Sequence, residues 1–178
     1  MSDLDEFRRA KDRWMSLDPQ SPLTAEQRRR FGGLVYFDEA PDLAILVTPE
    51  RVSGMSLVEM ATSSGETAMY EEWAHTAFDV DGASATLTIY RHPATDSLFL
   101  PFRDATSGHE TYGAGRYLEV HELEDGHLLL DFNYAYNPYC AYNEGYSCPI
   151  PPPENRLSVA IRAGERMFDG RTAEHRHE

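Results

Sequence analysis

The spacing of apolar residues changes at Gly33, and this change limits the folds that the chain can adopt. Before it, apolar side chains recur every three or four residues, as on one face of a helix. That face is formed by Leu4, Phe7, the stem of Lys11, Trp14 and Leu17. After Gly33 the apolar stretches are short, rich in β-branched and aromatic residues, and bounded by turn residues, as β-strands are. The pattern predicts a helical segment followed by a mainly β domain.

The helical segment is expected to span residues 1–33. Asp18-Pro19 ends the first periodic stretch, and Thr24 with Gln27 predicts a capping box at the start of a shorter second helix. A single amphipathic helix is not stable alone. Its apolar face is therefore expected to pack on the β domain.

The β domain is expected to span residues 34–170, with a polar tail at 171–178. The expected strands cover residues 34–37, 43–47, 56–62, 75–80, 83–90, 98–102, 116–123, 127–133 and 157–161. Two Asp-Gly pairs, Asp81-Gly82 and Asp125-Gly126, predict hairpins. Because no long helices alternate with these strands, the prediction is an antiparallel barrel or rolled sheet of about eight strands.

Composition excludes several classes of protein. The chain has 178 residues and a formal net charge of −14, and nearly all of the excess acidic residues follow residue 31. Such an acidic protein lacks the basic surface that nucleic acids and anionic membranes require. No apolar run approaches the roughly 20 residues of a membrane span. The acidic start, without an apolar segment behind it, does not resemble a secretory signal, so a cytoplasmic location is expected.

Polar residues concentrate among the apolar stretches of residues 101–156, where each costs free energy unless it has a partner. With a two-residue turn at Asp125-Gly126, Val120 faces Asp131 and Leu118 faces Asn133. Arg116 would then share a face with Asp131 and Asn133. This register predicts a polar pocket around Arg116 and Asp131.

Two interpretations of this region remain open. In the first, the protein is a small-molecule-binding protein or enzyme. Arg116 holds an anionic or carbonyl group, and Asp131, Asp104 or Glu110 serves as base or hydrogen-bond acceptor. The candidate binding residues are Asp104, Glu110, Tyr112, Arg116, Asp131, Asn133, Tyr136, Asn137, Glu154, Asn155 and Arg156. In the second, the protein is a non-catalytic β scaffold or protein-interaction module, and the same residues form a buried structural network. The sequence identifies no cofactor and no oligomeric state.

Cys140 and Cys148 are the only cysteines. Two thiols cannot complete a four-ligand zinc site, and the histidines at 109, 121 and 127 show no recognised ligand spacing. Reduced thiols are the first expectation, a disulfide the second and a metal site the third.

Three stretches resemble a known family. They are Ser21-Pro22-Leu23-Thr24 with Phe31-Gly32-Gly33-Leu34-Val35-Tyr36-Phe37, then Glu110-Thr111-Tyr112-Gly113-Ala114-Gly115-Arg116-Tyr117-Leu118, and the motif residues between Asp131 and Leu157. Together they resemble the domain of unknown function family 1684, of bacteria and archaea. The resemblance covers nearly the whole chain, and it implies no established reaction, cofactor or catalytic residue.

Overall fold

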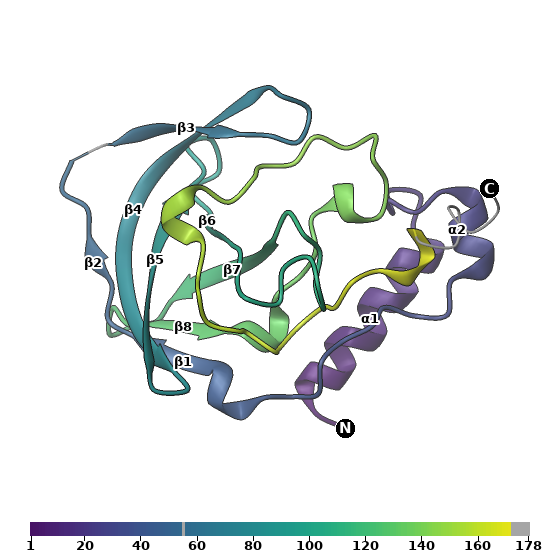
Figure 1. The fold of residues 1–178 in the computed structure, drawn as a ribbon, viewed down its shortest axis with the longest axis horizontal. Helices are drawn as coiled ribbons and strands as arrows, with labels where there is room; N and C mark the ends of the chain where they lie inside the picture. Colours follow the sequence, from purple (N-terminus) through teal and green to yellow (C-terminus); the bar gives the residue numbers. More distant parts are fainter. Residues whose placement is uncertain (55, 172–178) are drawn as a thin grey trace.

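A curled antiparallel sheet of eight strands forms the body of the protein (Figure 1). The computed structural model describes residues 1–54 and 56–171. The strands are β1 (Ala44–Val47), β2 (Glu50–Arg51), β3 (Leu57–Ala61), β4 (Thr67–Val80), β5 (Ala83–Arg91), β6 (Leu98–Phe102), β7 (Arg116–Glu122) and β8 (Leu128–Asp131). Their order is β1-β8-β7-β6-β5-β4-β2, and β3 pairs with β4. This half-barrel confirms the predicted fold class, whereas the expected polar tail falls outside the described residues from 172 onward.

The strand predictions differ from the structure at four places. The two-residue strand β2 lies outside every predicted range. Residues 34–37 contribute a single bridge, between Tyr36 and Glu165. Residues 157–161 form no strand: Leu157 and Val159 exchange backbone hydrogen bonds with Arg103 and Ala105, and the Ile161 N–H then donates to the Asp104 carboxylate. Strand β4 begins well before the predicted 75–80, in a stretch whose acidic residues interrupt the apolar pattern.

The two helices form where the sequence predicts them. Helix α1 (Asp3–Leu17) ends at its C-cap Asp18, and α2 (Ala25–Arg30) begins with the predicted capping box between Thr24 and Gln27. In Figure 1, α1 lies on the side of the molecule opposite β2 and β4. The side chains that α1 buries are Leu4 and Met15, whereas Leu17 is 75% exposed. Placing Leu17 on the packed face was therefore wrong, since in the last turn of the helix it is Met15 that is buried.

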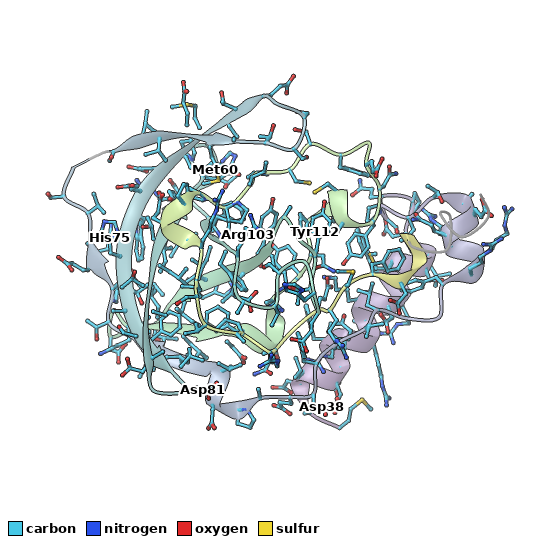
Figure 2. All side chains as sticks on the ribbon, in the orientation of Figure 1. Asp38, Met60, His75, Asp81, Arg103 and Tyr112 are labelled. Atoms are coloured by element: carbon cyan, nitrogen blue, oxygen red, sulfur yellow. The ribbon has the colours of Figure 1, made fainter. Side chains whose placement is uncertain are left out.

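The two predicted hairpins both form, with different loops. Asp81 and Gly82 make a two-residue loop with positive φ at both positions, between the paired Val80 and Ala83 (Figure 2). At the second hairpin the loop has three residues. There the Leu123 N–H donates to the His127 carbonyl, and Gly126 takes the positive φ that a three-residue loop requires.

The extra loop residue moves the β7–β8 register by one. His121 pairs with Leu129 and Glu122 with Leu128, so the predicted facing of Val120 and Asp131 is wrong. A one-residue shift reverses the face on which every side chain of a strand lies. Asp131 consequently lies on the opposite face from Arg116.

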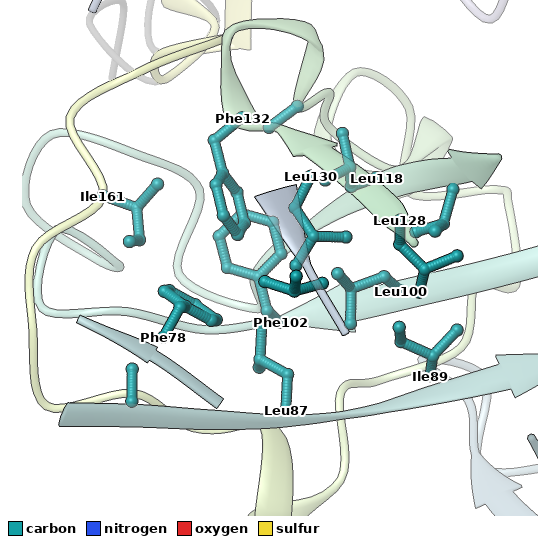
Figure 3. Packing of buried hydrophobic residues seen from close by; sticks show 14 of the residues in the cluster. Phe78, Leu87, Ile89, Leu100, Phe102, Leu118, Leu128, Leu130, Phe132 and Ile161 are labelled. Carbon is teal, nitrogen blue, oxygen red and sulfur yellow. The ribbon is translucent and has the colours of Figure 1, made fainter. Parts of the chain in front are cut away.

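The concave face of the sheet encloses the main core (Figure 3). Leu118 and Val120 of β7 point inward with Leu128 and Leu130 of β8, and Ile161 closes the core from the C-terminal segment. The alternate residues of these strands point outward, towards α1. The inward side chains of β7 and β8 are used by the core, so their outward side chains are the ones available to line a binding site.

Candidate functional site

Arg116 is a buried anchor of the C-terminal segment. It is 1% exposed and is the first residue of β7. Its Nη1 donates to the carbonyls of Ala163 and Glu165, and its Nη2 donates to the carbonyl of Ile161. Its Nη2 also lies 3.7 Å from Oδ1 of Asp104, which is equally buried. Burial lowers the pKa of Arg116 to about 10, so the guanidinium stays charged at neutral pH.

Three further candidate residues hold loops against strands. Asn133 bonds both backbone groups of Ala40 through its side-chain amide. Asn155 is fully buried and bonds the backbone of Thr88 and the carbonyl of Pro101. Glu154 accepts a hydrogen bond from the Tyr90 hydroxyl at 2.6 Å. These contacts match the structural-network interpretation of the region.

Two candidates lie at the surface, away from the others. Glu110 pairs with Arg162 at 3.0 Å. Arg156 is exposed, next to the buried Asn155.

A cleft of about 1000 Å³ separates α1 from the outer face of the sheet. The side chains on its walls are mostly aromatic: Phe7 and Trp14 of α1, Tyr70, Phe99 and Tyr117 of the sheet, and Tyr134, Tyr136 and Tyr139 of the segment after β8. We call it the aromatic cleft. Of the predicted site residues, it contains Asp131, Tyr136 and Asn137. Its volume is at the upper end of the range for small-molecule sites.

The polar groups in the aromatic cleft are mainly acidic. Glu119 and Asp131 line it, together with His121. Among the described lining residues, Lys11 is the only lysine or arginine. Its Nζ lies 2.5 Å from Oε1 of the buried Glu165, so its charge is already balanced.

Tyr136 is the ring of the aromatic cleft that already contacts a cation. The Lys11 ammonium lies 5.0 Å from its ring centroid, and the ring of Tyr117 meets it edge-on. Burial raises the pKa of the Tyr136 hydroxyl, and nearby carboxylates, Glu119 foremost, add to the shift. The ring is therefore neutral and electron-rich over the physiological range, which suits contact with a cation.

Two cysteine side chains are buried beside the aromatic cleft. Cys140, in the 3₁₀ turn Tyr139–Ala141, and Cys148 are buried in one cluster with Tyr117, and they form no disulfide. Tyr112, another predicted site residue, donates its hydroxyl hydrogen to Cys140 Sγ at 3.6 Å (Figure 2). The Cys148 thiol hydrogen bond lowers the pKa of Cys140, and the same bond with burial raises the pKa of Cys148.

Sequence reasoning missed most of the aromatic cleft. It did not select Phe99, Tyr117 or Glu119, which the pairing of β6 with β7 brings together, or Trp14, which the docking of α1 adds. The available signal was the density of tyrosines from Tyr134 to Tyr142, together with the aromatic residues seven positions apart on α1.

Other kinds of site find no support in the described residues. Within residues 1–54 and 56–171, no three histidine, cysteine or acidic side chains cluster as a metal site would need. None of the helices found in these same residues combines the length and the apolar character needed to cross a bilayer.

The comparisons with known proteins agree with the fold. A family model described as "Protein of unknown function (DUF1684)" matches residues 29–166. The chain is similar to an uncharacterized protein of Haloarcula marismortui, solved by solution NMR. The two share 42% identity with a TM-score of 0.72, over 93% of this chain and 92% of that one. No curated protein matches. The chain therefore belongs to the DUF1684 family of proteins of unknown function.

Proposed function

We propose that the protein binds a small organic cation with an apolar body in the aromatic cleft. The observation that carries this proposal is the composition of the wall, which includes eight aromatic rings and two carboxylates. Aromatic faces attract cations, and the attraction grows where water is excluded. Lys11 over Tyr136 is an internal example of the same contact.

The charges in the aromatic cleft favour a cationic ligand there. An anionic ligand is the one that was expected at Arg116. The guanidinium of Arg116 is enclosed by carbonyl groups and by Asp104, whereas Glu119 and Asp131 line the aromatic cleft. The net charge of −14 adds a long-range attraction for cations.

The test compares three probes of similar size by isothermal titration calorimetry: benzyltrimethylammonium, benzyl alcohol and benzoate. Binding is expected for the cation, weakly for the alcohol and not for benzoate. Trp14 lines the aromatic cleft whereas Trp73 is buried in the core, so the cation should also quench tryptophan fluorescence.

Variants locate the binding. Tyr136→Leu removes the ring that Lys11 contacts, and Glu119→Gln removes one charge. Each is expected to weaken cation binding by about five- to thirtyfold, in line with 1–2 kcal/mol for a desolvated cation–π contact. Glu59→Gln, an exposed position on β3, is the matched control and should change nothing. Equal affinity for benzoate, or full affinity in Tyr136→Leu, would refute the proposal.

A protein-interaction module is the second candidate function, and one observation favours it. Leu123 and Leu129 line the aromatic cleft and are 41% and 43% exposed. Exposed apolar side chains next to a groove are typical of a surface that docks another protein. Light scattering over a concentration series separates the two. Self-association that Leu129→Asp abolishes, without cation binding, supports the docking function.

A further inference from the structure

Cys140 and Cys148 are in contact at the wall of the aromatic cleft. The backbone N–H of Cys140 donates to Cys148 Sγ at 3.4 Å, and the two thiols also hydrogen-bond each other. Cys148 lines the cleft, so a small molecule in the cleft reaches this member of the pair, and Cys140 lies directly behind it. Neither thiol takes part in the cation binding proposed above.

The surroundings stabilise one negative charge on the pair. Tyr112 donates its hydroxyl hydrogen to Cys140 Sγ. This donor and the Cys148 thiol lower the pKa of Cys140, while the pKa of Cys148 is raised. The pair therefore presents a thiolate next to a protonated thiol. A thiolate is the reactive form of cysteine, and a neighbouring thiol can resolve its first oxidation product.

The backbone already holds the two cysteines together. The Cys148 carbonyl accepts a hydrogen bond from the Ser63 N–H, and the Cys148 N–H donates to Ser63 Oγ. This anchors Cys148 to the end of β3, while Cys140 lies in a 3₁₀ turn against it. The segment 140–148 therefore has its ends together before any bond forms, and joining the sulfurs requires only a local adjustment.

We propose that Cys140 and Cys148 are a redox-active dithiol that hydrogen peroxide converts into an intramolecular disulfide. The Cys140 thiolate attacks one peroxide oxygen, the O–O bond breaks, and hydroxide leaves and takes a proton from solvent. Cys140 is then a sulfenic acid. The Cys148 sulfur loses its proton and attacks the Cys140 sulfur, the S–O bond breaks, and the hydroxide released takes that proton. Together the two sulfurs lose two electrons, the peroxide gains them, and two water molecules result.

The experiment exposes the native full-length chain to one equivalent of hydrogen peroxide, removes the excess with catalase, and alkylates it with N-ethylmaleimide in denaturant. Intact mass spectrometry is expected to show a loss of about 2 Da and no maleimide, reversed by dithiothreitol. Cys148→Ser should accumulate a sulfenic acid on Cys140, trapped with dimedone. Cys140→Ser should react about tenfold more slowly, since the remaining thiol is protonated.

A matched pair of tyrosine variants keeps the test valid if the serine variants fail to fold. Tyr112→Phe removes the hydroxyl donor to Cys140 and should slow oxidation several-fold. Tyr146→Phe changes a nearby tyrosine whose ring meets that of Tyr139 edge-on, and it should react at the wild-type rate. Far-UV circular dichroism confirms the fold of each variant.

Three results would overturn the proposal. They are two alkylated thiols after peroxide treatment, disulfide-linked dimers in place of the internal bond, and equal rates for Tyr112→Phe and wild type. Cation binding and peroxide oxidation are measured on separate protein samples. A failure to bind the cation would therefore leave the conclusion about Cys140 and Cys148 unaffected.

Discussion

Replacing Arg116 with methionine should destabilise the fold strongly, although the sequence suggested a ligand-binding role. Methionine fills much of the same volume but supplies none of the three hydrogen bonds to the carbonyls of Ala163, Glu165 and Ile161. A hydrogen bond to a charged group contributes about 1.5–3 kcal/mol. The change also leaves Asp104 buried without its cation, for which the usual cost is about 3–5 kcal/mol.

These costs overlap, because one guanidinium serves all the partners. We expect a total loss of about 4–6 kcal/mol, which is a large share of the 5–15 kcal/mol that stabilises a typical domain. Arg116→Lys keeps the charge but not the planar fork, and it should lose about half as much.

Urea unfolding followed by circular dichroism measures these values. Arg156→Met is the matched control, because Arg156 is an exposed arginine from the same predicted set, and it should change stability by no more than about 0.5 kcal/mol. If the free energy of unfolding of Arg116→Met stays within about 1 kcal/mol of wild type, the hydrogen bonds of Arg116 do not stabilise the fold. If Arg116→Met is too unstable to purify, Arg116→Lys provides the measured value.

Three further changes test other parts of the structure. Gly115→Ala should cost several kcal/mol in urea unfolding, because Gly115 has φ +109° and its new Cβ would lie 2.6 Å from the Phe102 carbonyl oxygen; stability equal to wild type would contradict this packing. Lys11→Met should cost about 2–4 kcal/mol by leaving Glu165 unpaired, and adding Glu165→Gln should recover part of that loss in a double-mutant cycle; strict additivity would show that the pair is uncoupled. Stability should rise with pH between the lowered pKa of Cys140 and the ordinary thiol value, because the unfolded chain there holds a proton that the native protein has lost; a rise that persists in Cys140→Ser would have another source.

The architecture was predictable because each element carries a local signal. The capping box at Thr24 and the loop at Asp81-Gly82 depend on residues within a few positions of one another, and both form as predicted. The site was not predictable to the same degree. At Asp125-Gly126 the loop uses three residues rather than two, a difference that no local rule decides, and it reversed the face of Asp131 relative to Arg116.

The aromatic cleft was hidden from the sequence for a different reason. One wall belongs to α1 and the other to strands and loops more than 50 residues away. Trp14 and Tyr139 come together only when α1 docks. Aromatic residues on a helix predict burial in general, and they do not identify the surface that they face.

The pairing of Lys11 with Glu165 gives the protein a built-in reporter. Lys11 is the only lysine in the chain, and its ammonium is held against a carboxylate that is 1% exposed. An amine-directed acylating reagent should therefore modify Lys11 faster when α1 lifts away from Glu165, and peptide mapping distinguishes this amine from the terminal one. The acylation rate at this residue measures how often the wall of the aromatic cleft opens, without any engineered label.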